Sequence, residues 1–208
     1  MTARSRVAGL VGSASVLVVG LSIAALAGGA QHDITLQRAR VTIAGTSNIH
    51  DYTASTADVR IVRLEVAGTL PEADPWGALL TPGTLQAFEV AIPAASLSSP
   101  REGLDKNMHK ALKVKEHPMI AFRLARLQPA EGTGAFRAEG MLTVAGVERA
   151  VVLDLIVERQ PAGLIVRGGT SLLMTDFGIA PPRAMLGLLR TDPKVTVRFE
   201  LVLGASLT

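Results

Sequence analysis

The stretch LDKNMHKALKVKEHPMIAFRL, residues 104–124, changes from one periodicity to another and decides how the chain around it folds. Its first half repeats Leu104, Met108 and Leu112 at intervals of four, which predicts a helix with one apolar face. Pro118 interrupts this pattern, and apolar residues then fall at every second position, which predicts a half-buried strand. The apolar members of that strand are Ile120, Phe122 and Leu124.

The segments on either side also alternate apolar and polar residues, most fully in KVTVRFELVL, residues 194–203. The alternation slips near residues 37–40, which predicts a bulge in the first strand. Residues 70–84 contain three prolines and two glycines, and we expect a surface loop there that carries Trp76. A second expected loop, residues 176–193, has an apolar turn made of Met185, Leu186, Leu188 and Leu189. The predicted strands are residues 33–44, 52–67, 85–92, 118–127, 135–144, 147–159, 164–174 and 194–203.

Eight strands joined mostly by short connections predict an antiparallel all-β domain with one apolar face and one inserted helix. Such a face is buried either in a closed barrel or in a two-sheet sandwich. Several strands reach ten or more residues, which favours a barrel of tilted strands. Ala138, Gly140 and Gly168 lie on the inward parity, where they either leave room for a ligand or accommodate coiling of the strands.

The composition of the 208 residues excludes several classes of function. There is no cysteine, so disulfides, thiolate metal sites and thiol nucleophiles are excluded. Aromatic residues make up only 3% of the chain, which argues against a stacking platform for nucleic acids. The chain has 21 Lys and Arg against 18 Asp and Glu, and without Arg4 and Arg6 the balance is 19 against 18. We therefore expect no nucleic-acid partner.

The first 30 residues have the pattern of a secretory signal peptide. Arg4 and Arg6 precede an apolar run without acidic residues, and small residues close that run. We expect cleavage after Ala27 or Ala30, with residues 31–208 forming one domain that is periplasmic or secreted. An uncleaved membrane anchor is the alternative, because the run is long enough to span a bilayer.

Four stretches of the sequence, in this order, resemble the bacterial YceI-like family. Residues 45–51, GTSNIHD, are similar to a divergent form of the family's first-hairpin signature. Residues 101–122, which end in HPMIAF, are the most specific match. Residues 140–147, GMLTVAGV, resemble the family's Gly-x-Leu-Thr-x-x-Gly hairpin, and residues 175–179, TDFGI, resemble the end of its seventh strand. The resemblance covers residues 34–203, nearly all of the expected mature chain.

This resemblance implies an exported protein with an extended, lipocalin-like barrel of eight antiparallel strands and one inserted helix. It also implies a long isoprenoid inside the barrel, such as a polyprenyl diphosphate or a quinone tail. The chain departs from the family pattern at three places. Met174 and Thr175 stand where the family has an Arg, Glu148 stands where it has a Thr, and a histidine near the end of the first hairpin has no clear counterpart.

An isoprenoid chain would be held by burial of apolar surface, which contributes roughly 25 cal/mol per Å². The alternative for each candidate lining residue is that it is plain core. The predicted lining is Phe88, Val90, Ile120, Phe122, Leu124, Phe136, Leu142, Leu153, Leu155, Leu172, Val197 and Phe199. The polar face of the predicted helix carries three lysines, Lys106, Lys110 and Lys113. These lysines could contact a phosphate headgroup or an anionic membrane surface. The alternative is that they are solvated.

The remaining polar residues give little support for catalysis or metal binding. No two of His50, His109 and His117 have the spacing of metal ligands, so we expect solvated or hydrogen-bonding roles and no metal or other cofactor. Ser47 near His50 is the only local candidate for a nucleophile with a base, and it lacks an elbow motif. We therefore predict a protein that is not an enzyme, with a metal-dependent enzyme as a weaker hypothesis.

Our first hypothesis is an exported binding protein that sequesters or carries an isoprenoid-like lipid or quinone in an apolar barrel. The alternative is a dry barrel that acts as an interaction or adhesion module of the cell envelope, without a small-molecule ligand. A dry barrel has a filled interior, so a cavity larger than about 300 Å³ would argue against it. Peripheral contact with a membrane and formation of a homodimer are compatible with the sequence.

Overall fold

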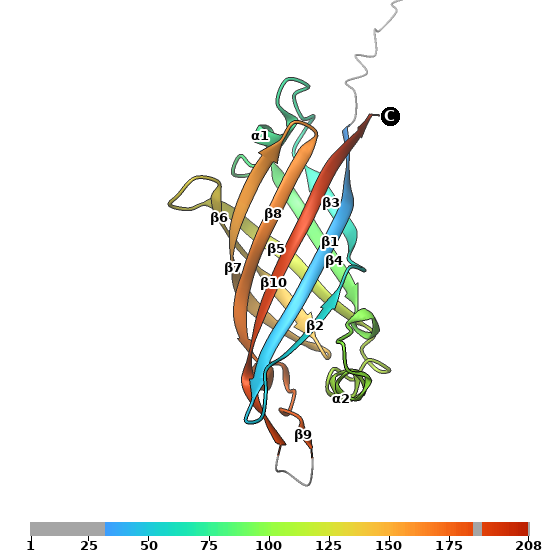
Figure 1. Ribbon diagram of the computed structural model, residues 1–208. Coiled ribbons are helices and arrows are strands. Elements are labelled where there is room, and N and C mark those ends of the chain that lie inside the picture. The colour runs from blue at the N-terminus through green and yellow to red at the C-terminus, as the bar shows by residue number, and fades with distance from the viewer. Residues whose placement is uncertain (1–31, 185–188, 208) are drawn as a thin grey trace, which may run out of the picture.

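The computed structural model describes residues 32–184 and 189–207. The predictions about the leader and about Met185, Leu186 and Leu188 of the apolar turn therefore lie outside the described residues. The described chain forms one antiparallel sheet that curls into an elongated barrel, with helical segments at both ends (Figure 1). No helix within these two ranges is long and apolar enough to cross a membrane.

The sheet follows the path β2-β1-β10-β8-β7-β6-β5-β4-β3, with the short β9 paired to β10 outside this path. The prediction of an all-β antiparallel barrel is confirmed, but the described residues form ten strands rather than eight. The strands are β1 (His32–Ser47), β2 (Tyr52–Thr56), β3 (Arg60–Val66), β4 (Leu85–Pro93), β5 (Met119–Pro129), β6 (Ala135–Val144), β7 (Val147–Gln160), β8 (Gly163–Leu173), β9 (Arg183–Ala184) and β10 (Leu189–Leu207). The helical segments are α1 (Pro75–Leu79), η1 (Ala94–Ser96), α2 (Glu102–Ala111) and η2 (Met174–Phe177).

The strand predicted for residues 52–67 is in fact two strands with different neighbours. β2 pairs with β1, whereas β3 pairs with β4 at the opposite edge of the sheet. The change of parity within β3 comes from a bulge, because Ile61 and Arg63 pair with the adjacent residues Val90 and Glu89 of β4. Val62 is the extra residue, and its side chain is 59% exposed on the outer surface.

The barrel closes between β1 and β3 without a backbone ladder, and no backbone hydrogen bond joins these two strands in the described part of the chain. Side chains close this seam instead, because Leu36 of β1 and Ile61 of β3 pack against the same buried cluster. Nearer α2, the connector that follows β4 covers β2. There the backbone of Ser98 exchanges two hydrogen bonds with Ser55, at 2.8 and 3.0 Å.

Two further features of the strands concern β1 and β10. The bulge predicted in the first strand is confirmed, because Leu36 pairs with Leu203 and Arg38 with Val202, which leaves Gln37 as the extra residue. The last strand begins at Leu189, earlier than predicted, because its first residues pair with β9. The alternation of side chains did not show this extension, since Pro193 and Asp192 interrupt the pattern.

Residues 70–84 are not the simple surface loop that their prolines and glycines predict. They contain α1, whose N-terminus is capped by Asp74, the carboxylate of which accepts a hydrogen bond from the Gly77 N–H at 2.9 Å. Trp76 is only 6% exposed and packs with Leu79 against the buried side chains of β6, β7, β8 and β10. α1 therefore covers one end of the barrel, and the helix is too short to show a periodicity in the sequence (Figure 1).

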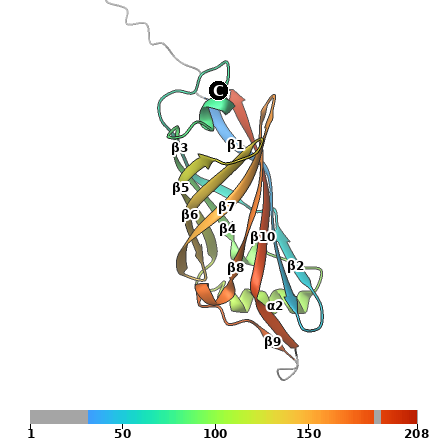
Figure 2. The same cartoon turned by 90° about the vertical axis from the view of Figure 1, so that its left-hand side faces the viewer.

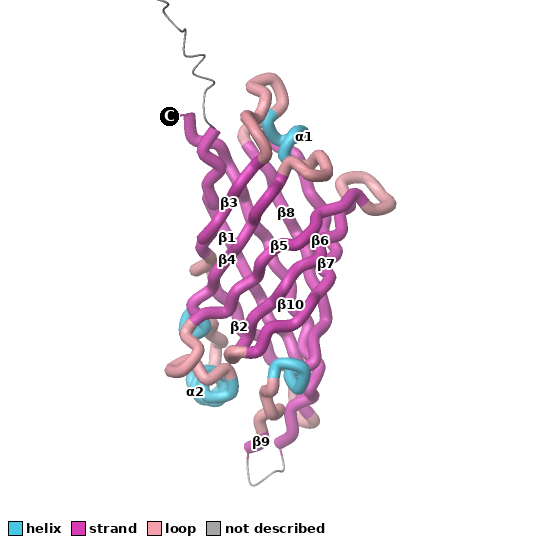
Figure 3. Tube along the Cα trace, turned by 180° about the vertical axis from the view of Figure 1, so that it is seen from behind, coloured by secondary structure: helices cyan, strands magenta, loops and turns pink. Residues whose placement is uncertain are grey.

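α2 lies across the other end of the barrel (Figures 2 and 3). Its apolar residues contact the cluster below it, as the sequence predicts, and its first turn carries Glu102 and Asp105. After α2, the N–H of Val114 donates to the His109 carbonyl at 3.2 Å and that of Lys113 to the Lys110 carbonyl at 3.1 Å. This helix-ending motif places Lys113 in the left-handed region, at φ 52°. The prediction that Lys113 shares a helix face with the other two lysines is therefore wrong.

Gly140 and Gly168, two of the three small inward residues of the wall, do not leave room for a ligand, whereas Ala138 borders a cavity. A Cβ atom on Gly140 would lie 2.5 Å from the ring of Phe122, and one on Gly168 would lie 2.7 Å from the ring of Phe199. Each glycine therefore admits an aromatic ring from a neighbouring strand against the wall of the barrel. The space inside the barrel lies elsewhere.

Candidate ligand-binding site

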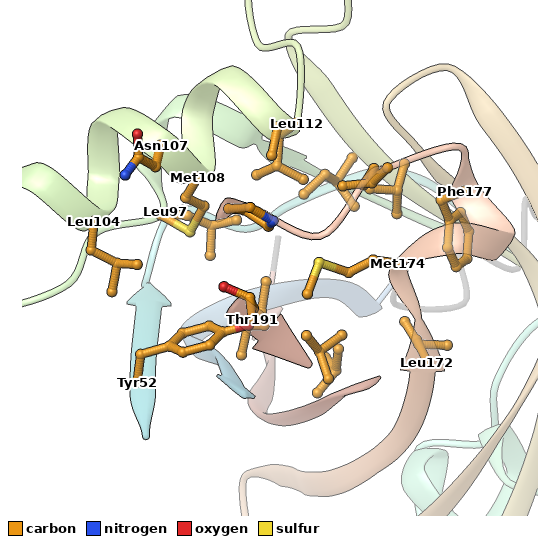
Figure 4. A pocket seen from close by; sticks show the side chains of 18 of the residues that line it. Tyr52, Leu97, Leu104, Asn107, Met108, Leu112, Leu172, Met174, Phe177 and Thr191 are labelled. Atoms are coloured by element: carbon orange, nitrogen blue, oxygen red, sulfur yellow. The ribbon is translucent and has the colours of Figure 1, made fainter. Parts of the chain in front are cut away.

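The barrel contains an outer cavity of about 430 Å³ at the end that α2 covers (Figure 4). Met108 and Leu112 reach into it from α2, Met174 and Phe177 from η2, and Leu172 from β8. The volume lies within the range of roughly 300–1,000 Å³ that is usual for small-molecule sites. Most of the side chains around the cavity are aliphatic or aromatic, so its walls favour an apolar ligand.

A second, inner cavity of about 180 Å³ lies further along the barrel, towards α1. Leu79, Leu80 and Leu85 border it, and among the described residues that line it only Thr170 has a polar side chain. Five side chains line both cavities, so the two cavities are neighbours inside the barrel. The shared residues are Val41, Ile92, Leu142, Leu172 and Val197.

The structure brings eleven of the twelve predicted lining residues to one or both cavities. Ile120 borders the outer cavity, Leu142, Leu172 and Val197 border both, and the other seven border the inner cavity. Those seven are Phe88, Val90, Phe122, Leu124, Leu153, Leu155 and Phe199. Phe136 differs, because it packs against the cluster around Trp76 and lines neither cavity. The role of these residues in binding remains a prediction.

Polar side chains gather at one part of the outer cavity, where it reaches the surface. Arg101, at the residue before α2, donates from its guanidinium to Nε2 of His50 in the β1–β2 connection. Because a guanidinium only donates, Nε2 of His50 is the acceptor and carries no proton in this contact. The Ser47 hydroxyl donates to the His50 carbonyl at 2.7 Å, so it belongs to the turn and does not pair with the imidazole. Ser47 and His50 therefore do not form a nucleophile with its base.

Tyr52 extends from β2 across β1 towards Thr191 of β10 (Figure 4). Its ring lies over Gly45, where a Cβ atom would lie 2.4 Å from the ring. Burial raises the pKa of the Tyr52 phenol above its ordinary value of 10.0, and the negative charge of Asp192 raises the pKa further. The phenol is thus a neutral O–H group at the cavity wall at physiological pH.

Two hydrogen bonds fix α2 over the outer cavity. Nε2 of His109 donates to the carbonyl of Leu97 at 2.8 Å, and a carboxylate oxygen of Asp105 accepts from the N–H of Ser99 at 2.8 Å. Leu97 is only 1% exposed and lines the cavity beneath the helix. The apolar face of α2 is therefore held in place by side chains from its own polar positions.

The predicted headgroup residues Lys106, Lys110 and Lys113 are exposed and do not line either cavity. The structure thus separates them from the apolar interior, and no observation assigns them a ligand. Among residues 32–184 and 189–207, no three His, Asp or Glu side chains cluster closely enough to hold a metal ion.

Comparison with known proteins agrees with the resemblance in the sequence. The model of the YceI-like domain matches residues 41–203, most of the chain. This chain belongs to the YceI-like domain family. No curated protein sequence matches it significantly.

Solved structures share the YceI-like fold at low sequence identity. BcnA from Burkholderia cenocepacia superposes with a TM-score of 0.63 at 16% identity, over 82% of this chain and 99% of BcnA. A polyisoprenoid-binding domain from Saccharophagus degradans has a TM-score of 0.57 at 11% identity, over 85% of this chain and 100% of that domain. The YceI protein of Campylobacter jejuni has a TM-score of 0.51 at 15% identity, over 73% of this chain and 85% of its own. At these identities the likeness shows the fold alone.

The sequence did not point to several residues of this YceI-like barrel that border the outer cavity. Arg101 lies in the connector before α2, and Asn107 lies on that helix. Thr191 lies near the start of β10, and Tyr52 begins β2. Arg101 and Asn107 fall within residues 101–122, the stretch that resembles the family, but the resemblance assigned them no role in binding. The chain brings the four residues together only when the barrel forms. One signal was available for Tyr52, since a lone tyrosine beside the GTSNIHD turn stands out in a chain with few aromatic residues.

Proposed function

We propose that this chain is a binding protein that sequesters or carries an isoprenoid-like lipid or a quinone in the interior of its barrel. The observation that carries the proposal is the pair of adjacent cavities, of about 430 and 180 Å³, with five apolar side chains common to both. Burial of a chain in such a space contributes about 0.8 kcal/mol per methylene group. The affinity therefore depends on the length and shape of the chain more than on hydrogen bonds.

The same cavities argue against a dry barrel that acts only through its surface. The outer cavity exceeds the volume of about 300 Å³ above which small-molecule sites are usually found. The YceI-like family is a family of binding proteins and not of known enzymes, and a similar structure is described as a polyisoprenoid-binding domain. These comparisons support the class of ligand that we propose and leave its identity open.

The two ends of the barrel favour one orientation of the ligand. At the α1 end, Trp76 and Leu79 are buried over the inner cavity. At the α2 end, the outer cavity is bordered by exposed polar side chains, among them His50 and Arg101. We propose that the apolar tail points towards α1 and the polar end of the ligand towards α2, because a polar group buried without partners is costly.

Native mass spectrometry of the protein purified without harsh detergent tests the proposed function. We expect a bound lipid, or uptake of an added polyprenol or of a quinone with an isoprenoid tail. Protein that is consistently empty and takes up neither class would refute the proposal. A matched control is the variant Val152→Trp on the outer surface, where the side chain is 48% exposed and binding should not change.

We further propose that the protein works outside the cytoplasm and that Lys106 and Lys110 contact anionic lipid surfaces from the exposed side of α2. The first proposal rests on the signal-peptide pattern of residues 1–30, and the second on the exposure of both lysines. Cell fractionation with sequencing of the mature N-terminus tests export. Co-sedimentation with anionic vesicles, compared between the unchanged protein and a Lys106→Gln, Lys110→Gln variant, tests the contact, which equal co-sedimentation would contradict.

A further inference from the structure

The lining of the cavities carries an uneven set of charges. Among the described residues that border either cavity, Arg101 is the one permanent cation, and no Asp or Glu borders them. The lysines of α2 lie outside both linings. Among the described lining residues, a ligand inside the barrel therefore meets a single guanidinium, at the outer cavity.

The other polar groups around the outer cavity supply mainly donors. Arg101 has five N–H groups and uses one of them on His50. The raised pKa of Tyr52 keeps its phenol as an O–H group, and Asn107 offers an amide N–H₂. A compact acceptor with one negative charge matches this set, because a guanidinium binds a carboxylate through two parallel hydrogen bonds.

We propose that the outer cavity binds a long apolar chain that ends in a carboxylate, and that Arg101 binds this end group. The inference rests on the proposed function, since it assumes that a lipid chain occupies the barrel. The inference narrows the ligand class to an amphiphile with one negative charge. It also makes Arg101 the residue that distinguishes such an amphiphile from a neutral lipid.

A diphosphate end group is disfavoured at the same place. It carries more than one negative charge, whereas the described lining residues offer one guanidinium, so part of its charge would lose water without gaining a cation. Asp192 also acts against it, because this carboxylate is close enough to Tyr52 to raise the pKa of the phenol. The second charge of a diphosphate, which has no guanidinium of its own among the described lining residues, would face that carboxylate, whereas the single charge of a carboxylate is paired with Arg101.

Three ligands with the same geranylgeranyl chain and different end groups test the proposal. These are geranylgeranoic acid, geranylgeraniol and geranylgeranyl diphosphate, each titrated against the full domain by displacement of a fluorescent lipid. We expect the acid to bind about tenfold more tightly than the alcohol, which is the order of one charge-assisted hydrogen-bonded pair at a partly exposed site. We expect the diphosphate to bind more weakly than the acid.

Arg101 variants identify the residue responsible. Arg101→Gln should remove the preference for the acid over the alcohol and leave the affinity for the alcohol within about twofold, because apolar burial does not involve the guanidinium. Arg101→Lys keeps the positive charge and should restore part of the preference. The control Arg126→Gln removes an exposed cation from β5 that borders neither cavity, and it should change nothing.

The outcomes separate the two proposals. If all three ligands bind equally well and Arg101→Gln has no effect, the carboxylate inference is refuted and the lipid-binding function stands. A preference for the diphosphate that is lost in Arg101→Gln would also refute the inference, because the end group would then be multiply charged. If folded protein binds none of the three, the carboxylate inference is refuted, and the lipid-binding function falls with it when a quinone with an isoprenoid tail is not taken up either.

Discussion

Leu142 lines both cavities, so a large side chain there should block the passage of a ligand tail from the outer cavity into the inner one. We choose Leu142→Trp, because the indole adds volume where the two cavities meet. The inner cavity of about 180 Å³ corresponds to roughly six water-sized groups at about 30 Å³ each, and a methylene group is of similar size. At about 0.8 kcal/mol per methylene, filling the inner cavity contributes at most about 5 kcal/mol.

Ordering of the tail offsets part of that gain, so we take roughly half of it as the net loss in the variant. A loss of about 2.7 kcal/mol corresponds to a dissociation constant about 100-fold larger. We therefore expect Leu142→Trp to bind geranylgeraniol about 100-fold more weakly. Geraniol has half the chain length and can be held in the outer cavity alone, so its affinity should change less than about threefold.

The assay is displacement of a fluorescent lipid by each alcohol, with the fold checked by circular dichroism. Val152→Trp adds the same side chain on the outer surface of β7 and should leave both affinities unchanged. If Leu142→Trp folds and still binds geranylgeraniol as tightly as the unchanged protein, the inner cavity does not hold the tail. If both alcohols lose affinity equally, the variant distorts the outer cavity and the reasoning from the two volumes is wrong.

Three further predictions concern the fold. Burial and Asp192 raise the pKa of Tyr52, the only tyrosine of the chain, so its phenolate absorbance should appear at a higher pH in the folded protein than in denaturant. The raised pKa stabilises the folded protein fully below about pH 10, and this stabilisation is lost as the pH rises through the pKa of Tyr52 in the folded protein. Equal titration midpoints in the folded and the denatured protein would contradict the prediction. In urea titrations, Trp76→Ala should reduce the free energy of unfolding by about 3–5 kcal/mol, because the side chain is buried. The control Val152→Ala, at an exposed position, should reduce it by less than about 1 kcal/mol. A similar small loss for both variants would mean that α1 does not close the barrel. In hydrogen exchange, the amides of β3 and of the first half of β1 that face the seam between these two strands should exchange faster than the amides of β6, which is paired on both sides. Equal protection of these amides would show that a backbone ladder crosses the seam.

Local patterns in the sequence were sufficient for most of the strands. The alternation of β4 to β8 gave their bounds within a few residues, since a side chain on a two-sided strand is either in the core or in water. The slip near Gln37 predicted the bulge in β1 for the same reason. The apolar repeat Leu104, Met108 and Leu112 predicted the face of α2 that covers the barrel.

Alternation says which way a side chain points, but not which strand lies beside it. The sequence therefore joined β2 and β3 into one strand, although they pair with opposite edges of the sheet. It also could not decide whether Gly140 and Gly168 leave room for a ligand or accommodate coiling, because only the register shows that Phe122 and Phe199 lie over them.

The sequence by itself determined that this chain is an antiparallel all-β domain with one apolar face, because the period of the side chains records burial directly. Strand length and the family resemblance favoured a barrel over a sandwich. Only the tertiary structure decided how that interior is divided and what borders it. Arg101, His50 and Tyr52 meet at the outer cavity because the β1–β2 connection and the segment before α2 converge at one end of the barrel. Trp76 closes the other end through a helix of five residues. These contacts join residues distant in the chain, and no local periodicity encodes them.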